Sequence, residues 1–292
     1  MNLQISQNDP QNAFSRPKVD IESLVETSLP PSPDNIMRLS ELLRDYNTPP
    51  RKISQALISE PMLVTRILRL ANSPIYALER KINSIEGAVT TIGNKALLEM
   101  IMMTIASSAF AREIRNSVIA RKIWEHSIAV AVIAREISEM LNMQGTEESF
   151  TCGLLHDIGK MILLSYDFQG FSMTLSETSE EKMLTSEEQL YGYNHAQIGA
   201  LVARRWGLQE EVCYAVNYHH ASFHNDFLMI VTHIIEVADI IANIKGYGLR
   251  NEDEETLSNS VSVIRLRLDE DNLRQVWSNV EGKLGEIIKS CT

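Results

Sequence analysis

Apolar residues recur every three to four positions along most of this chain, a spacing that is typical of amphipathic α-helices. The first half predicts helices over these segments: 33–46, 51–59, 61–71, 85–92 and 95–111. The segment 95–111 is apolar on nearly all sides, so we expect that helix to be central and buried. No alternating apolar and polar run is long enough to predict a β-strand.

The second half continues the pattern, with predicted helices over 120–141, 146–157, 194–206, 210–218, 228–242 and 272–289. Gly159 marks a predicted break after the helix over 146–157. Residues 176–190 are acidic and polar, which we interpret as a solvated face or a loop, and NEDEE at 251–255 predicts a charged loop. The last helix carries an apolar stripe, which predicts packing on its own domain. A role of that helix in oligomerisation is the alternative, so the oligomeric state stays open.

The composition supports a helical protein and argues against one class of partner. Among 292 residues there are only 13 glycines and nine prolines, and 6% of residues are aromatic, which favours helices over a β-sandwich or barrel. The net charge is −11. A broad nucleic-acid-binding face needs clustered lysine and arginine, so we expect no nucleic-acid partner.

Targeting signals and cysteines point to a protein of the cytoplasm. Residues 1–14 have neither the basic start nor the apolar run of a signal peptide, so we expect none there. The longest apolar stretch, 101–111, is shorter than the ~20 residues that a membrane-spanning helix needs. The three cysteines form no CxxC pair, which is typical of a reducing compartment. We therefore expect a cytoplasmic protein without membrane contact.

Five of the seven histidines and two aspartates are the strongest candidates for chemistry. His156 and Asp157 are adjacent in GLLHDIGK (153–160), and they offer a metal ion one imidazole and one carboxylate that can bridge two ions. The other candidates occupy predicted helices or helix ends: His126, His195, His219, His220 and Asp239. Because a carboxylate is costly to bury alone, Asp239 inside an apolar helix calls for a partner or a metal ion. A helical bundle can gather such residues into one metal site.

Each of these residues also has a purely structural interpretation. A histidine can bond a backbone carbonyl in the core or interact with the dipole at a helix C-terminus. Asp239 can pair with an arginine, and Lys160 can be a surface lysine. If every one of the seven residues had a purely structural role, seven separate explanations would be needed. A common site explains all of them together and is therefore favoured. We assign no role to His224, in a predicted loop, or to His233, on an apolar helix face.

These residues resemble the His…His-Asp…Asp pattern of the HD superfamily of metal-dependent phosphohydrolases, seen here as His126, His156–Asp157 and Asp239. The HD-GYP branch, which hydrolyses cyclic di-GMP, adds histidines like His195 and the pair His219–His220, and its HDxxK lysine is similar to Lys160. More specifically, the chain resembles the HDOD (HD-related output domain) family over roughly residues 25–245. The segments that carry this resemblance are LPPSP (29–33), ISEPMLVTRILRLANSPIY (58–76), INSIEGAVTTIG (82–93), WEHSIAVAVIAR (124–135), GLLHDIGK, NHAQIGALVARRWGL (194–208) and YAVNYHH (214–220).

The resemblance implies an all-α, HD-domain-like helical bundle with an N-terminal helical subdomain. Together with the polar, aperiodic start of the chain and the amphipathic pattern at its end, it predicts four parts: a disordered tail (1–22), the N-terminal helical part of HDOD (23–110), the HD-like bundle with the metal site (111–245), and a C-terminal loop with an amphipathic helix (246–292). It also implies one or two divalent ions, of Mn, Fe or Mg, held by His126, His156, Asp157, His195, His219, His220 and Asp239.

Two positions depart from the pattern of the HD-GYP enzymes. Those enzymes have a GYP triad shortly after the paired histidines, whereas this chain reads ASFHNDF (221–227). They also carry a glutamate ligand one helical turn before the first histidine, whereas this chain has Lys122. HDOD proteins are regarded as signalling or regulatory modules.

Two functions follow from the resemblance and its departures. The favoured one is a bacterial signal-transduction protein that acts through protein partners or a small nucleotide ligand and retains the metal site. The alternative is a phosphohydrolase that cleaves a nucleotide or a cyclic dinucleotide. In that alternative Asp157 bridges two ions, a shared water attacks phosphorus in line, and Lys160 stabilises charge on a phosphate oxygen.

Overall fold

The computed structural model describes residues 19–28, 39, 42, 45, 48–57, 61–72, 81–143, 146–220, 229–250 and 252–291. Within these ranges the chain forms helices and no β-strand, so the predicted all-α fold class is confirmed. None of the helices in the same ranges has the length and hydrophobicity to cross a bilayer. The predicted tail (1–22) and the predicted helix over 33–46 lie mostly outside the described residues. Helix α1 (Ile21–Ser28) begins at the end of that predicted tail.

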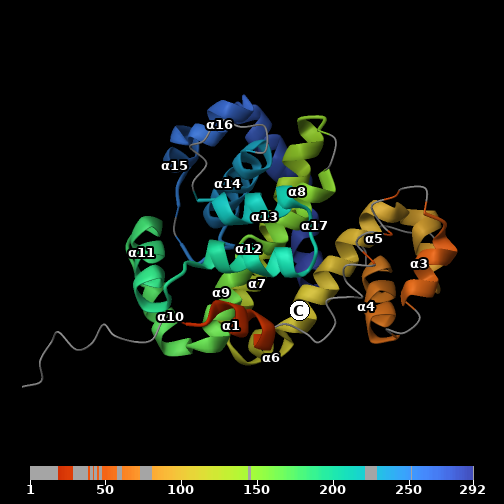
Figure 1. Ribbon diagram of the computed structural model, residues 1–292. Coiled ribbons are helices and arrows are strands. Elements are labelled where there is room, and N and C mark those ends of the chain that lie inside the picture. Colours follow the sequence, from red (N-terminus) through yellow and green to blue (C-terminus); the bar gives the residue numbers. More distant parts are fainter. Residues whose placement is uncertain are drawn as a thin grey trace, which may run out of the picture.

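The N-terminal helices pack side by side at one edge of the molecule. Helices α3 (Pro50–Leu57) and α4 (Pro61–Ala71) both contact α5 (Ile85–Ala109). Figure 1 shows them beside the first part of α5, while the second part of α5 runs toward the main bundle. Gly93 kinks α5 with a φ of 83°, at the point where the sequence predicts one helix to end and the next to begin. Helix α6 (Ala111–Asn116) then turns the chain into the bundle.

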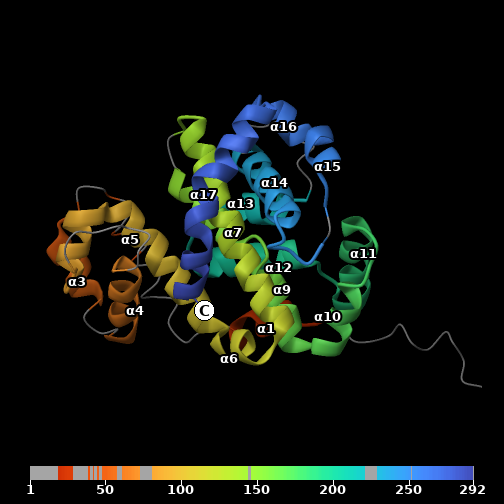
Figure 2. The ribbon, with the colours of Figure 1, turned by 180° about the vertical axis from the view of Figure 1, so that it is seen from behind.

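The main bundle is built around α7 (Val118–Met140), whose middle is a run of small and β-branched apolar residues that are buried on every side. Helices α8, α14 and α17 contact α7, and α9 and α13 complete the bundle with α12 (Figures 1 and 2). The bounds of these helices are α8 (Thr146–Leu155), α9 (Ile158–Tyr166), α12 (His195–Arg205), α13 (Glu210–Tyr218), α14 (Met229–Ile244) and α17 (Glu270–Cys291). The apolar stripe of α17 faces α7, which confirms that this helix packs on its own domain.

Several helices lie where the sequence analysis predicted none. Helix α10 (Phe168–Thr174) follows α9, and α15 (Glu254–Asn259) and α16 (Val261–Leu266) follow the charged segment after α14. The residue that precedes each of these three helices caps it, because its side chain accepts a hydrogen bond from a backbone N–H of the first turn. Such a cap is a local signal for a helix start, but it is hard to recognise in segments that are polar throughout. Helix α11 (Glu180–Tyr191) occupies the segment interpreted as a solvated face or a loop. Most of its residues are exposed or partly exposed, as a solvated face requires, but the segment is a helix and not a loop.

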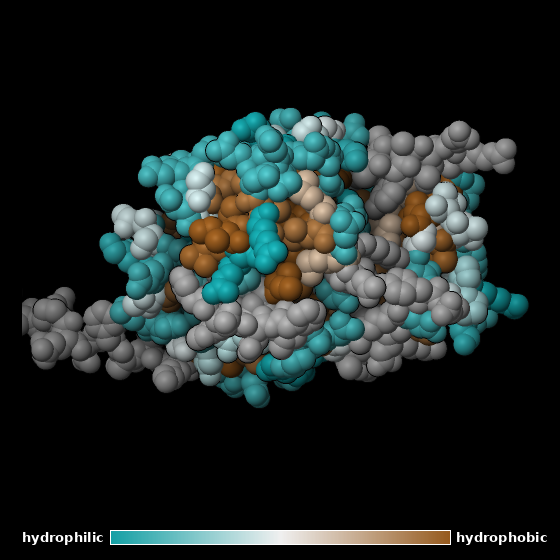
Figure 3. Space-filling view, turned by 90° about the horizontal axis from the view of Figure 1, so that it is seen from above, coloured by the Kyte–Doolittle hydropathy of each residue, from teal (hydrophilic) through white to brown (hydrophobic). Residues whose placement is uncertain are grey.

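Helix α16 is tied to α14 by a buried polar network rather than by apolar contacts alone. His233 Nδ1 lies 2.6 Å from the hydroxyl of Ser262, and that hydroxyl also lies 2.8 Å from a carboxylate oxygen of Glu236. His233 thus has a structural partner. At the same end of the molecule, seen from above in Figure 3, hydrophilic side chains frame a hydrophobic area.

Close contact between α7 and α8 depends on Gly153. A Cβ atom added there would lie 2.7 Å from Ala131 Cα and 2.8 Å from its backbone nitrogen, distances that real Cβ contacts avoid. We expect Gly153→Ala to lower the free energy of unfolding by about 1–3 kcal/mol, because the two backbones must separate. The matched control is Gly285→Ala on the exposed face of α17, where nothing lies within 4 Å. That substitution should raise stability by about 0.5–1 kcal/mol in the same urea titration. Equal effects of the two variants would contradict this packing.

Candidate metal centre

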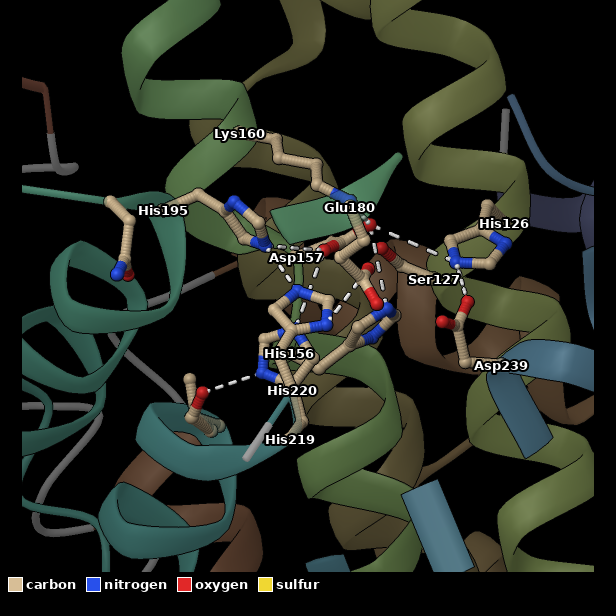
Figure 4. Close-up of polar contacts among 12 residues, drawn as sticks. His126, Ser127, His156, Asp157, Lys160, Glu180, His195, His219, His220 and Asp239 are labelled. Atoms are coloured by element: carbon tan, nitrogen blue, oxygen red, sulfur yellow. Dashed lines mark hydrogen bonds and ion pairs between the residues drawn. The ribbon is translucent and has the colours of Figure 1, made fainter. Parts of the chain in front are cut away.

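The structure brings all seven candidate ligands to one place in the bundle (Figure 4). They come from five positions in the fold: the middle of α7 (His126), the turn between α8 and α9 (His156 and Asp157), the first residue of α12 (His195), the end of α13 (His219 and His220) and the middle of α14 (Asp239). Their side chains are at most about a tenth exposed. Residues more than 100 positions apart therefore share one buried polar cluster.

Local sequence fixes the helix ends that present these side chains. Asn194 caps α12 and forms a reciprocal capping box with Gln197, which sets His195 as the first helical residue. The helix break predicted at Gly159 falls instead at His156 and Asp157, and Gly159 lies in the first turn of α9. A Cβ atom at Gly159 would collide with the carbonyl oxygen of His195. The absence of a side chain there allows α9 and the start of α12 to approach each other.

One group of donor atoms gathers on one side of Asp157. His126 Nε2 lies 2.9 Å from Asp239 Oδ1, and His126, His156 and Asp239 each offer an atom within 4.8 Å of the others. The Oδ2 atom of Asp157 lies 3.7 Å from His126 Nε2 and 3.4 Å from His156 Nε2. These three residues and one oxygen of Asp157 form the first donor group.

A second group gathers at the other oxygen of the same carboxylate. Asp157 Oδ1 lies 3.5 Å from His195 Nε2 and 3.8 Å from His219 Nε2. His220 Nε2 lies 2.8 Å from His195 Nε2. Three histidines and Oδ1 of Asp157 form the second donor group, so the two oxygens of Asp157 face different sets of ligand atoms.

These separations fit bound metal ions. Atoms that coordinate one ion at about 2.1 Å lie about 3.0–3.4 Å apart in tetrahedral or octahedral geometry, and the separations above run from 2.8 to 3.8 Å. Four buried atoms of the candidate ligands have no hydrogen-bond partner among the described residues. One is His126 Nδ1, the ring nitrogen that does not contact Asp239, and three belong to the donor groups: His156 Nε2, Asp157 Oδ1 and His219 Nε2. Leaving buried polar atoms unpaired is costly, and a metal ion would satisfy the three in the donor groups. The residues present therefore fit a divalent metal, while the role of each as a ligand stays a prediction.

Backbone carbonyls orient two of the histidines. His156 Nδ1 lies 2.7 Å from the carbonyl oxygen of Gly153, and His219 Nδ1 lies 2.7 Å from that of Val216. A carbonyl can only accept, so each Nδ1 carries the proton and donates it. The lone pair of each ring is then on Nε2, toward Asp157, as metal-bound histidines require.

Helix α11 supplies two carboxylates that sequence reasoning missed. Glu187 is fully buried, and one of its oxygens accepts from both Nδ1 and the backbone N–H of His195 at 2.8 Å. Glu180 Oε1 lies 2.8 Å from His220 Nδ1. Both carboxylates thus support imidazoles of the second donor group. The signal for Glu187 was its spacing, because Met183, Glu187 and Tyr191 follow one another at four-residue intervals and all three are buried.

Two cations lie at the edge of the cluster. Lys160 Nζ is buried and donates to Asp157 Oδ2 at 2.8 Å. Arg250, in the segment after α14, pairs with Glu180, and Glu180 and Asp239 raise its pKa despite the opposing effect of burial. Arg250 was not singled out from the sequence, where it is simply the basic residue beside NEDEE.

The electrostatics favour the protonation states that metal binding needs at His195, His219 and Asp157, but not at His156. Burial alone would lower the pKa of His156, but Asp157 beside it raises that pKa above the usual value, so a metal ion must displace a proton there. Burial lowers the pKa of His195 and of His219 well below the usual value, so both rings are neutral. Burial alone would raise the pKa of Asp157, but His156 and Lys160 hold it well below its usual value, so the carboxylate is ionised. Burial raises the pKa of Glu187 to about 7.

Of the two departures from the HD-GYP pattern, only Lys122 lies in the described part of the chain. The side chain of Lys122, on α7 one turn before His126, is exposed to solvent. Residues 221–227, and with them His224, lie outside the described residues. The seven candidate ligands therefore gather without a glutamate from position 122.

Comparison with solved structures shows the fold. A proposed phosphohydrolase from Shewanella amazonensis SB2B is 23% identical, with a TM-score of 0.73 over 94% of this chain and 99% of that one. An HDOD domain protein of unknown function from Geobacter sulfurreducens is 24% identical, with a TM-score of 0.68 over 93% of this chain and 98% of that one. A proposed signal transduction protein from Marinobacter aquaeolei VT8 is 18% identical, with a TM-score of 0.73 over 94% of this chain and 61% of that one.

Comparison of sequences shows the family. An uncharacterized protein of Treponema pallidum is 27% identical over 191 residues, which cover 63% of this chain but only 36% of that protein. The family model for the HDOD domain matches residues 29–222, about two thirds of the chain, and this range contains six of the seven candidate ligands, all except Asp239. The resemblance inferred from the sequence motifs is thereby confirmed, and the chain belongs to the HDOD domain family.

Proposed function

We propose that this protein is a signal-transduction module whose bundle holds two divalent metal ions and responds to a small phosphate-containing ligand. The observation that carries the proposal is the placement of Asp157, whose two oxygens face two separate groups of donors. One carboxylate between two sets of imidazoles is the arrangement expected of a bridging ligand. Mn, Fe and Mg remain the candidate metals.

Charge argues for an anionic ligand at this centre. Asp157, Asp239, Glu180 and Glu187 carry at most four negative charges, and Lys160 and Arg250 carry two positive ones. With two divalent ions bound, the centre therefore keeps a net positive charge. Such a charge attracts phosphate even though the whole protein has a net charge of −11.

A signalling role is favoured over hydrolysis by the position of the cations. In hydrolysis, Lys160 would act on a phosphate oxygen, but its ammonium group is buried and bonded to Asp157. Lys122 is exposed and contributes no carboxylate. The chain thus retains the donors for metal binding while lacking a free, pre-positioned lysine for catalysis.

Phosphodiester hydrolysis is the second candidate, and the completeness of the donor set favours it. Bound divalent ions would supply an activated water and a binding site for phosphate. Asp157 would hold the two halves of the site together, and Lys160 would exchange Asp157 for a phosphate oxygen as charge develops there. Descriptions of the structural neighbours as phosphohydrolases or as a signal transduction protein are compatible with either candidate.

Hydrolysis assays on the metal-loaded protein separate the two candidates. We expect no cleavage of cyclic di-GMP, a linear dinucleotide or bis(p-nitrophenyl) phosphate above the rate of the His156→Ala variant in Mn²⁺, Fe²⁺ or Mg²⁺. Cleavage that disappears in both His156→Ala and Asp157→Asn would establish the hydrolase and overturn the purely regulatory role.

A further inference from the structure

A second candidate ligand site lies away from the metal centre, where the N-terminal helices meet the bundle. A cavity of about 90 Å³ is lined by α4, the second half of α5, α6 and the end of α17. Figure 2 shows the end of α17 beside α5, and α17 contacts both α4 and α5. The indole N–H of Trp124 donates to the carbonyl oxygen of Cys291 and holds the end of α17 in place. The cavity therefore touches elements from both ends of the chain.

Three arginines line this cavity without a compensating carboxylate. They are Arg66 and Arg69 on α4 and Arg115 on α6. Among the described residues that line the cavity, none is acidic, and none of the three guanidinium groups pairs with a carboxylate in the described part of the chain. The protein has 38 acidic residues against 27 lysines and arginines, so a concentration of unpaired positive charge is unexpected.

Helix dipoles explain only part of this charge. Helices α4, α5 and α17 all end near the cavity, and each C-terminus carries a partial charge of about −0.5. Three such ends offset about half of the three positive charges. A surplus of positive charge remains for an external anion.

One of the arginines is already held in place. Arg66 Nη1 donates to the hydroxyl of Ser108 at 2.6 Å, and that hydroxyl bonds the carbonyl oxygen of Thr104 at 2.6 Å. Arg66 is also partly buried, whereas Arg69 and Arg115 are exposed. A fixed guanidinium group loses less conformational freedom when it binds, and its other N–H groups remain available.

We infer that this cavity binds a phosphate group through Arg66, Arg69 and Arg115. Guanidinium groups match the oxygens of phosphate in pairs of parallel hydrogen bonds. The volume is several times the ~10–15 Å³ that one water needs, which suits a tetrahedral oxyanion but not an enclosed nucleoside. The phosphate is either free or the terminal group of a larger molecule whose remainder stays outside. Binding joins α4 and α6 and fastens the N-terminal helices to the bundle, which extends the proposed signalling role.

The test is phosphate binding by the full-length protein, measured by calorimetry with chloride added to match ionic strength. Wild-type protein should bind inorganic phosphate. Arg66→Gln and Arg115→Gln should each weaken binding by about tenfold, the effect of losing one charged hydrogen-bond donor. The control is Arg112→Gln, an exposed arginine of α6 that does not line the cavity, and it should bind as the wild type does.

A parallel titration with AMP identifies the source of the phosphate. If AMP binds more tightly than inorganic phosphate, and this binding depends on Arg66 and Arg115, the ligand is a nucleotide phosphate. If AMP binds no more tightly than inorganic phosphate, the ligand is the free ion. No binding of either compound would overturn the inference. Binding that is the same in Arg66→Gln and Arg115→Gln as in the wild type would also overturn it and would place all of the phosphate at the metal centre. A component that persists beside an arginine-dependent one is binding at the metal centre, so the inference and the proposed metal function fail separately.

Discussion

Asp157→Asn is expected to remove both metal ions from the protein. Each oxygen of Asp157 faces one of the two donor groups, and an asparagine offers one neutral carbonyl oxygen in place of two that share a negative charge. Bound metal per chain should fall from two to below one after dialysis against metal-free buffer. Inductively coupled plasma mass spectrometry on purified protein measures this ratio directly.

The same substitution leaves Lys160 buried without its carboxylate. Breaking a buried ion pair on one side costs about 3–5 kcal/mol, so metal loss must be separated from unfolding. The double variant Asp157→Asn/Lys160→Met removes the stranded charge and should regain much of the lost stability, yet it should still lack metal. Asp271→Asn, an exposed carboxylate on α17, is the control that should bind two ions. Two ions retained by the double variant would contradict a bridging role for Asp157.

Glu187→Gln is expected to weaken the binding of one metal ion and to leave the binding of the other unchanged. Glu187 accepts from both the ring and the backbone of His195, which belongs to the second donor group, and Glu180 supports His220 in the same group. By contrast, a backbone carbonyl orients His156 in the first group. Loss of such a supporting carboxylate typically costs 10–100-fold in metal affinity.

Calorimetric titration with Mn²⁺ resolves the two binding steps. In Glu187→Gln one step should keep its wild-type dissociation constant, and the other should weaken by about 10–100-fold. The matched control is Glu181→Gln, an exposed glutamate of the same helix, which should show two unchanged steps. A uniform weakening of both steps in Glu187→Gln, or no change in either, would mean that α11 does not support the second ion.

The spacing of apolar residues is the reason that most of the bundle helices and the candidate ligands could be predicted from the sequence. Apolar spacing specifies a helical face, and a polar residue that interrupts such a face, as Asp239 does, stands out against it. His195 and His219 lie at helix ends that the sequence marks, the first through its cap Asn194. The break at His156 and Asp157 was instead predicted at Gly159. A common site for these residues was inferred from their joint occurrence at helix positions, and the family resemblance supplied the ligand pattern.

Helix α11 illustrates what the sequence could not reveal. Its surface is acidic, so its composition favoured a solvated segment, and only tertiary packing against the cluster makes Glu187 a buried partner of His195. The sequence offered Asp157 as a carboxylate that can bridge two ions, but the direction in which each of its oxygens points is visible only in the structure. Arg250 and its ion pair with Glu180 join segments 70 residues apart.

Metal analysis of the wild-type protein beside Asp157→Asn is the decisive comparison for a two-ion centre that depends on Asp157. We predict two divalent ions per wild-type chain, fewer than one in the variant, and a lower melting temperature of the wild type after chelation, because ligands that bind only the folded state stabilise it. A folded wild-type protein that binds no divalent metal, with a melting temperature unaffected by chelator, would contradict the account.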